Sequence, residues 1–531
     1  MTDSVTHRVV RSGAVVTVGT ALSRFTGLGR VLVIAATLGF TRLTDSYNLA
    51  NESPNMVYEL LIGGVLTAVL VPTFVSVDET DDNGARNAIV GTALAGLVAI
   101  SILAVLAAPL LATLTTMRVP DAQRALQRDV VETLMRYLLP QVFFYGCFAL
   151  LAAMLNARRR FAAVAFAPAL NNIVVMAVLL IARQRFADDL ELDKASRTPL
   201  LLVTLGIGTT LGIVMMALAL VPAWRRTGVR IRPTFAPRHP AVRKLLHLSG
   251  WTIGYVVANQ ICLWVILVLA AREAGGVSTY LAAFLFFMLP YGVLAVSMIT
   301  PIVPELASAA RVDDPPQLQR TFGLGLRLVI LTMAPSTAIL VVLATPIVRT
   351  ALQRGAFDAA NAQATARTLA AMAIGLVGFS VYLFTLRVFY AQHNTRTPFF
   401  INVGENALNI ALALVLSPTL GIEGLALANA IAYSLGAAIA LIFVHRRIGG
   451  FGHARLGGIP KIVGAALAAA GAASLGLLFD VPLLECVVGG GLALATFVGF
   501  LAILRADELQ VVLRMLRRSR GNDEASAGVT P

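Results

Sequence analysis

The chain has 531 residues, of which 57% are hydrophobic and only 13% are charged, and its formal net charge is +14. A mean hydropathy of +0.80 excludes a soluble globular protein, because too few polar side chains are available to cover its surface. The basic excess suits the anionic headgroups of a membrane, and we expect no nucleic acid partner.

Apolar runs long enough to cross about 30 Å of hydrocarbon recur from end to end and predict an all-α polytopic membrane protein. We expect about 14 transmembrane helices, with approximate limits at 13–38, 46–75, 87–113, 131–155, 161–182, 198–223, 243–271, 277–305, 320–348, 365–391, 397–416, 420–444, 459–479 and 484–504. No cleavable signal peptide is expected before the first of them. Lys and Arg gather in alternate loops, which predicts cytoplasmic N- and C-termini in a bacterial cell membrane.

The first predicted helix contains two arginines, Arg24 and Arg30, within an apolar sequence. Each guanidinium costs roughly 2.5–3.5 kcal/mol at the centre of a membrane helix, so each needs a compensating partner. One interpretation is that Arg24 pairs with a carboxylate of the next helix, such as Glu52 or Glu59. The other is an anion site facing a cavity, since arginine binds two phosphate oxygens at once. Glycines at 27 and 29 would allow the helix to bend so that both arginines face one cavity.

The second predicted helix begins with an unusually polar sequence, "TDSYNLANESPNMVYE". Spacing by three or four residues places four polar side chains on one face: Asn48, Asn51, Glu52 and Asn55. Lipid cannot satisfy such a face, so it must contact water or protein. The predicted substrate-binding residues are therefore Arg24, Arg30, Asp45, Asn48, Asn51, Glu52, Asn55 and Glu59.

Polar residues also occur inside later predicted helices, where we expect hydrogen bonds between helices. They are Asn171, Asn172, Asn259, Gln260, Asn402, Glu405, Asn406 and Asn409.

Two segments 237 residues apart indicate an internal duplication. "ILAVLAAPLLATL" (102–114) and "ILVVLATPIVRTA" (339–351) are identical at seven of thirteen positions. Six helices per repeat return the chain to the same side, so two lobes related by an axis along the membrane normal are expected, as in alternating-access carriers. The predicted domains are an N-lobe (1–228), a cytoplasmic linker (229–242), a C-lobe (243–449), a C-terminal helix pair (450–506) and a cytoplasmic tail (507–531).

No nucleotide-binding, zinc-binding or protease motif is present, so the sequence predicts a transporter without hydrolytic chemistry. No cofactor or metal is expected, and the energy would come from the membrane potential or an ion gradient. Cys147, Cys262 and Cys486 have no metal or redox spacing and are interpreted as packing residues.

Several motifs resemble those of the lipid II flippase family (MurJ/MviN), within the multidrug/oligosaccharidyl-lipid/polysaccharide exporter superfamily. They are "SRFTGLGR" (23–30), "TDSYNLANESPN" (44–55), "GGVLTAVLVPTF" (63–74), "LNARRRFAAVAFAPALNN" (155–172), "LPYGVLAVSMITPIVPELA" (289–307) and "FYAQHNTRTP" (389–398). The resemblance covers essentially the whole chain. It implies fourteen helices, a cationic central cavity, and a groove along the last two helices for a polyprenyl tail.

The resemblance also implies roles for individual residues. Arg24 and Arg30 match the family's essential arginines and would hold a lipid-linked diphosphate, and Asp45 matches its essential acidic residue. The chain departs from many members at Tyr58 and Glu59, where they carry an arginine pair, and at Leu285, where they carry one arginine. Residues 243–271 also lack the acidic residue of a reported sodium site. Actinobacterial-type relatives are similar in the second and eighth helices.

Three functions follow as expectations. The first is a flippase that moves undecaprenyl-diphosphate-linked peptidoglycan precursor (lipid II) from the inner to the outer leaflet. Its partners would be this substrate, membrane lipids and the cell-wall synthesis machinery. The second is export of another lipid-linked oligosaccharide, or a drug/ion antiporter of the same superfamily. The third is a scaffold for envelope synthesis that transports nothing.

Overall fold

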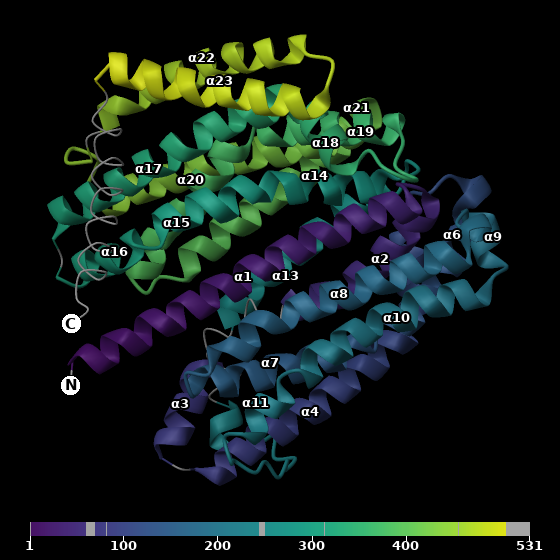
Figure 1. The fold of residues 1–531 in the computed structure, drawn as a ribbon. Helices are drawn as coiled ribbons and strands as arrows, with labels where there is room; N and C mark the ends of the chain where they lie inside the picture. Colours follow the sequence, from purple (N-terminus) through teal and green to yellow (C-terminus); the bar gives the residue numbers. More distant parts are fainter. Residues whose placement is uncertain are drawn as a thin grey trace, which may run out of the picture. The chain divides into compact units, whose positions relative to one another are not determined.

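The computed structural model describes residues 2–59, 70–80, 82–243, 250–312, 314–454 and 456–505, and these residues form helices and no β-strand (Figure 1). The chain divides into two compact units. The first contains Met1–Tyr280 and Leu352–Asn361, and the second contains Leu281–Ala351 and Ala362–Pro531. The predicted all-α fold is confirmed. The predicted domain limits and lobe symmetry stay predictions, and the predicted tail (507–531) lies outside the described residues.

The helices of the first unit are α1 (Thr2–Leu38), α2 (Arg42–Glu59), α3 (Val71–Glu79), α4 (Asn83–Leu106), α5 (Ala108–Thr115), α6 (Asp121–Leu138), α7 (Gln141–Ala157), α8 (Phe161–Arg185), α9 (Leu192–Ser196), α10 (Pro199–Leu218), α11 (Val221–Arg225) and α13 (Gly250–Ala270). The remaining helices are α14 (Gly276–Pro290), α15 (Val296–Ile299), α16 (Ile302–Arg311), α17 (Pro315–Val342), α18 (Ala344–Leu352), α19 (Ala359–Ala373), α20 (Leu376–Ala391), α21 (Arg396–Arg447), α22 (Ile459–Ser474) and α23 (Pro482–Ile503). They belong to the second unit, except for the start of α14, the last residue of α18 and the start of α19.

Eleven helices among the described residues are long and apolar enough to cross a membrane, or twelve if the bent pair α19 and α20 forms one span. The expected number of about 14 is consistent with this result for two reasons. Helix α21 covers two predicted spans, 397–416 and 420–444. The predicted span 46–75 includes residues 60–69, which lie outside the described part of the chain.

Local sequence explains where several helices begin. Asp82 precedes α4 and accepts a hydrogen bond from the backbone nitrogen of Ala85 at 2.8 Å, and Asp314 caps α17 in the same way through Gln317 at 3.0 Å. Such caps satisfy amide groups that have no partner inside the helix. Proline occupies the first turn of α10, where its missing N–H costs nothing.

Helix α1 packs along α8 in the first unit (Figure 1). Glycines make this contact close: a methyl group added at Gly19 would lie 2.6 Å from the Cβ atom of Ala165. At Gly27 and Gly29 it would lie 3.6 Å from Asn172 and 3.4 Å from Met176. Helix α1 runs from Thr2 to Leu38 without a break, and the two glycines that would allow a bend serve packing against α8.

Helix α21 consists of two arms joined at Gly421, whose backbone angles are φ 59° and ψ −136°. Side chains with a Cβ atom rarely adopt these angles, so glycine permits the sharp kink. The two arms lie side by side, because Gly436 of the second arm contacts Glu405 of the first. In the same unit, α22 and α23 pack on each other and on α17.

The predicted cytoplasmic linker (229–242) runs against α4. The backbone nitrogens of Arg232 and Thr234 donate to the side chain and the backbone oxygen of Asn87, at 2.9 and 3.0 Å. Gly91 leaves space for this approach, because a methyl group there would lie 2.3 Å from the backbone of Thr234. The linker is therefore held in place by the first unit.

Candidate functional site

Arg24 borders a cavity of about 450 Å³ in the first unit. The other lining residues come from α1, the end of α7 and the start of α8: Thr20, Ser23, Asn156, Phe161, Val164, Ala165 and Pro168. The Arg24 side chain is exposed, and within the described residues it forms no ion pair with Glu52, Glu59 or any other carboxylate. A guanidinium presented to a cavity in this way can bind an anionic group through two oxygens.

Arg30 has different surroundings from Arg24. It is half-buried, and its Nε atom has no hydrogen-bond partner in the part of the chain that the structure describes. Its charge acts on Glu52 of α2 and on Tyr145 of α7. Six residues along a regular helix separate two side chains by about 120°, which accounts for the difference.

The polar face of α2 forms a hydrogen-bonded group with α7. The Tyr145 hydroxyl donates to the Oδ1 atom of Asn55 at 2.6 Å, and the Nδ2 atom of Asn55 donates to Glu52 at 3.4 Å. The ring of Tyr58 lies 4.2 Å from that of Tyr145. Glu52 and Asn55 of α2 are therefore brought together with Tyr145, and the charge of Arg30 acts on this group.

The other predicted residues of α2 lie elsewhere. Asp45 is fully buried, and its Oδ1 atom accepts hydrogen bonds from the backbone nitrogen and the hydroxyl of Ser278, at 3.0 and 2.8 Å. Asn48 donates to the same hydroxyl at 3.0 Å. Asn51 is buried and Glu59 is exposed. Asp45 and Asn48 thus hold the first turn of α14, while their predicted role in substrate binding stays a prediction.

The corner between α1 and α2 is fixed by further contacts within the first unit. The guanidinium of Arg42 donates to the backbone oxygens of Ala271 and Arg272, at 2.5 and 2.9 Å. The backbone nitrogen of Ala356 donates to the backbone oxygen of Ala36 at 3.0 Å. Residues 36–45, 271–278 and 354–357 therefore form one connected group.

Three glycines in this group have positive φ angles and face a backbone oxygen. A methyl group at Gly39 (φ 64°) would lie 2.6 Å from the oxygen of Ala356. A methyl group at Gly275 (φ 76°) would lie 2.4 Å from the oxygen of Phe40, and one at Gly355 (φ 63°) would lie 2.3 Å from the oxygen of Ala36. No other residue type fits these positions without a shift of the backbone.

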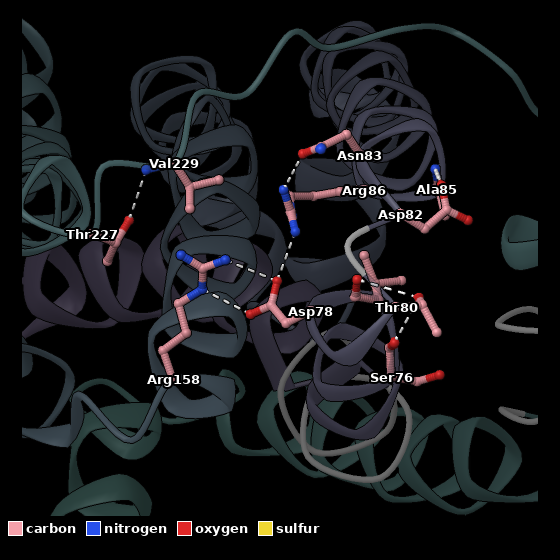
Figure 2. Close-up of polar contacts among 11 residues, drawn as sticks. Ser76, Asp78, Thr80, Asp82, Asn83, Ala85, Arg86, Arg158, Thr227 and Val229 are labelled. Carbon is pink, nitrogen blue, oxygen red and sulfur yellow. Dashed lines mark hydrogen bonds and ion pairs between the residues drawn. The ribbon is translucent and has the colours of Figure 1, made fainter.

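A separate ion-pair cluster lies outside the predicted spans, on the side that the sequence predicts to be cytoplasmic. Figure 2 shows Asp78 of α3 between Arg158 and Arg86. Arg158 contacts both carboxylate oxygens, at 2.7 and 2.9 Å, and Arg86 contacts one at 2.9 Å. The Arg158 guanidinium also lies 5.3 Å from the ring centroid of Trp224. The cluster joins α3, α4, α11 and the residue that follows α7.

Opposing effects set the charge of Asp78. Partial burial acts to raise the pKa of this carboxyl, but the hydrogen bonds and charges of Arg158 and Arg86 outweigh burial and hold the pKa below its usual value. The carboxylate therefore stays ionised and paired at neutral pH.

Two contributors to the site are absent from the sequence prediction, Tyr145 and Ser278. Tyr145 lies in an apolar run and carries no motif, and Ser278 is 233 residues from its partner Asp45. Asn172, predicted to bond between helices, does so: its Nδ2 atom donates to the Thr26 hydroxyl of α1 at 3.1 Å.

Residues 34–479 match the family model described as lipid II flippase MurJ. The chain belongs to the MurJ family. A relative from Rhizobium tropici named "Probable lipid II flippase MurJ" is 28% identical over 442 residues, which are 81% of this chain and 80% of the relative.

Solved structures agree on the fold of this MurJ family member. A structure titled "Lipid II flippase MurJ, inward closed conformation" has a TM-score of 0.78 at 21% identity and covers 93% of this chain and 99% of its own. An inward-facing multidrug resistance MATE family transporter of the MOP superfamily has a TM-score of 0.67 at 14% identity, covering 80% and 94%. The resemblance predicted from the sequence is confirmed, and the chain is a multi-pass inner-membrane transporter.

Proposed function

We propose that this chain moves lipid II from the inner to the outer leaflet by alternating access. The observation that carries the proposal is Arg24, an exposed guanidinium without a carboxylate partner in the described residues, beside a cavity within an otherwise apolar helix. A charge in this position is unfavourable unless a ligand compensates it. A diphosphate supplies the required two oxygens, and membership of the MurJ family supports this assignment.

In this proposal the predicted site residues have different roles. Arg24 makes the first contact with the diphosphate, and Arg30, with Glu52 and Asn55, forms a second polar position on the other side of α1. Asp45 acts through Ser278 as a positioning residue and does not touch the substrate.

The polyprenyl chain would stay in lipid, beside α22 and α23. These helices expose large apolar side chains, including Leu467, Val487 and Ile503. Such a surface suits a long hydrocarbon better than a polar cavity does.

The proposal includes the orientation and the energy source. Both termini would be cytoplasmic, which puts the Asp78 cluster and the basic linker on the same side. The membrane potential or an ion gradient would drive transport without hydrolysis or a cofactor, and the cell-wall synthesis machinery would receive the product.

Transport in liposomes containing the purified chain and lipid II tests the proposal. An enzyme that acts only on the outer leaflet would measure how much lipid II becomes accessible with time. We expect rapid equilibration with the intact chain, slow equilibration with Arg24→Ala, and no change with Arg136→Ala, whose arginine pairs with Glu132 on α6. Equal rates with and without protein would contradict the proposal. Movement of a different lipid-linked oligosaccharide or of a cationic dye in place of lipid II would favour the second candidate.

A further inference from the structure

The first arm of α21 turns a polar face toward the interior of the second unit. Four side chains on this face are almost completely buried, with exposures of 1% for Asn402, 3% for Glu405, 6% for Asn406 and 3% for Asn409. Three are neutral amides, whereas Glu405 is the one acidic residue on this face. The burial of an ionisable carboxyl group therefore needs a separate explanation.

Both carboxyl oxygens of Glu405 are buried and have no hydrogen-bond partner in the described residues. Gly436 of the second arm packs near Glu405, because an added methyl group there would lie 3.0 Å from the Glu405 Cγ atom and 3.4 Å from the ring of Tyr382 on α20. No Lys, Arg or His in the described parts of the chain forms an ion pair with Glu405. An ionised carboxylate in such surroundings costs several kcal/mol, and such groups neutralise instead.

Glu405 also lines a cavity of about 310 Å³ between the two arms. The other lining residues are Thr397, Phe400, Ile401, Gly404, Leu408, Gly436, Ile439 and Phe443. Apart from Glu405, only Thr397 has a polar side chain. A hard metal cation prefers six or more oxygen ligands, and this lining offers far fewer.

We propose that Glu405 is a proton-binding site of the second unit, protonated in the arrangement described here and able to release its proton when water enters the cavity between the arms of α21. The ligand is the proton itself: the carboxylate binds H⁺ to become a neutral carboxylic acid and returns it to water. Proton binding does not depend on the proposed lipid II transport, whereas any coupling of the two rests on it.

Few titratable groups face Glu405. From α20, Tyr382 approaches the same glycine as Glu405, Gly436, and from the second arm of α21, Tyr433 lies next to Tyr382 with ring centroids 5.5 Å apart. Arg387 is more than one turn further along α20, and Arg396 begins α21 more than two turns earlier. Ionisation of Glu405 would therefore not be compensated by a neighbouring cation of these helices.

Infrared spectroscopy of the full chain in lipid tests the proposal directly, because a protonated carboxylic acid has a carbonyl stretch separate from the bands of a carboxylate. We expect such a band at neutral pH, its loss as the pH is raised, and its absence from Glu405→Gln at all pH values. Glu423→Gln, on the same helix and half-buried, should retain it. Glu405→Asp keeps the acid and should show a shifted band, which guards against a folding defect in the Gln variant.

Three outcomes would overturn the proposal. The band is unchanged in Glu405→Gln, Glu405 is already ionised at neutral pH, or the band disappears at constant pH when sodium is added, which would indicate a metal cation site. None of these measurements uses lipid II, so a failure here is distinct from a failure of the flippase proposal.

Discussion

Asp45 and Ser278 are 233 residues apart in the sequence, yet one carboxylate oxygen of Asp45 accepts two hydrogen bonds from Ser278. The bonds join the start of α2 to the start of α14, and the carboxylate is fully buried. A residue expected to meet the substrate thus fixes the position of a helix end.

Replacement of Asp45 distinguishes a role in positioning α14 from a role in contacting the substrate. Asp45→Ala should destabilise the protein by roughly 1–3 kcal/mol, since the amide and hydroxyl of Ser278 lose their acceptor. Ser278→Ala should cost about 1 kcal/mol, and the double variant should cost less than the sum, because both changes remove the same bond. Chemical or thermal unfolding in detergent measures the loss of stability of each variant. Full stability of Asp45→Ala with loss of lipid II transport would instead indicate direct contact with the substrate.

Arg24 should be required for transport but not for folding. Arg24→Ala should unfold at the same temperature as the native chain, because no carboxylate in the described residues depends on it. Its transport rate should fall strongly, and Arg24→Lys should retain part of the rate because the charge remains without the two-pronged geometry.

The same variant decides between the two interpretations of Arg24. If the arginine were structural, Arg24→Ala with Glu59→Gln would restore both stability and growth of a flippase-depleted cell. We expect no such rescue, since Glu59 is exposed and unpaired with Arg24.

The Asp78 cluster should make stability depend on pH on the acid side. Because the pKa of Asp78 is lowered in the folded protein, its stabilisation is complete above the unfolded value of about 3.9 and is lost as the pH falls through the folded value. Unfolding temperatures measured from neutral to acid pH should drop for the native chain and drop less for Asp78→Asn.

Removal of the Asp78 carboxylate should also be costly at neutral pH. Arg86 is only 3% exposed and would keep only Asn83 as a partner, so Asp78→Ala should lose roughly 2 kcal/mol or more. Asp129→Ala, in an exposed pair with Arg128, should lose less than about 1 kcal/mol. Equal losses for the two variants would mean that the cluster has no special role.

Gly275 and Gly355 should not accept a side chain. Gly355→Ala combines a positive φ angle with a contact of 2.3 Å to the oxygen of Ala36, so we expect a loss of at least about 1–3 kcal/mol. Gly471→Ala is the matched control, because an added methyl group there meets nothing within 4 Å. Similar unfolding temperatures for both variants would contradict the close contacts of this corner.

The sequence predicts best the features that depend on local pattern. The helices, the polar face of α2 and the presence of Arg24 within an apolar helix all follow from spacing and hydropathy over fewer than about twenty residues. The MurJ resemblance extends the prediction to the whole fold, because its motifs are distributed along the chain.

Features that depend on distant contacts could not be predicted. Asp45 and Glu405 are both acidic residues of polar helices, but one has two donors from residue 278 and the other has no partner in the described residues. Gly27 and Gly29 would allow a bend, yet α8 packs against them and α1 remains one helix. In each case the deciding atoms belong to another part of the chain.

The continuity of α1 has a consequence for how an anion would travel. The backbones at Arg24 and Arg30 are about 9 Å apart along the axis of one uninterrupted helix and keep this spacing. In the proposed transport, a diphosphate that moves from one position to the next would therefore pass from one guanidinium to the other. The diphosphate would be released by one guanidinium as the other binds it, while both arginines keep their positions on α1.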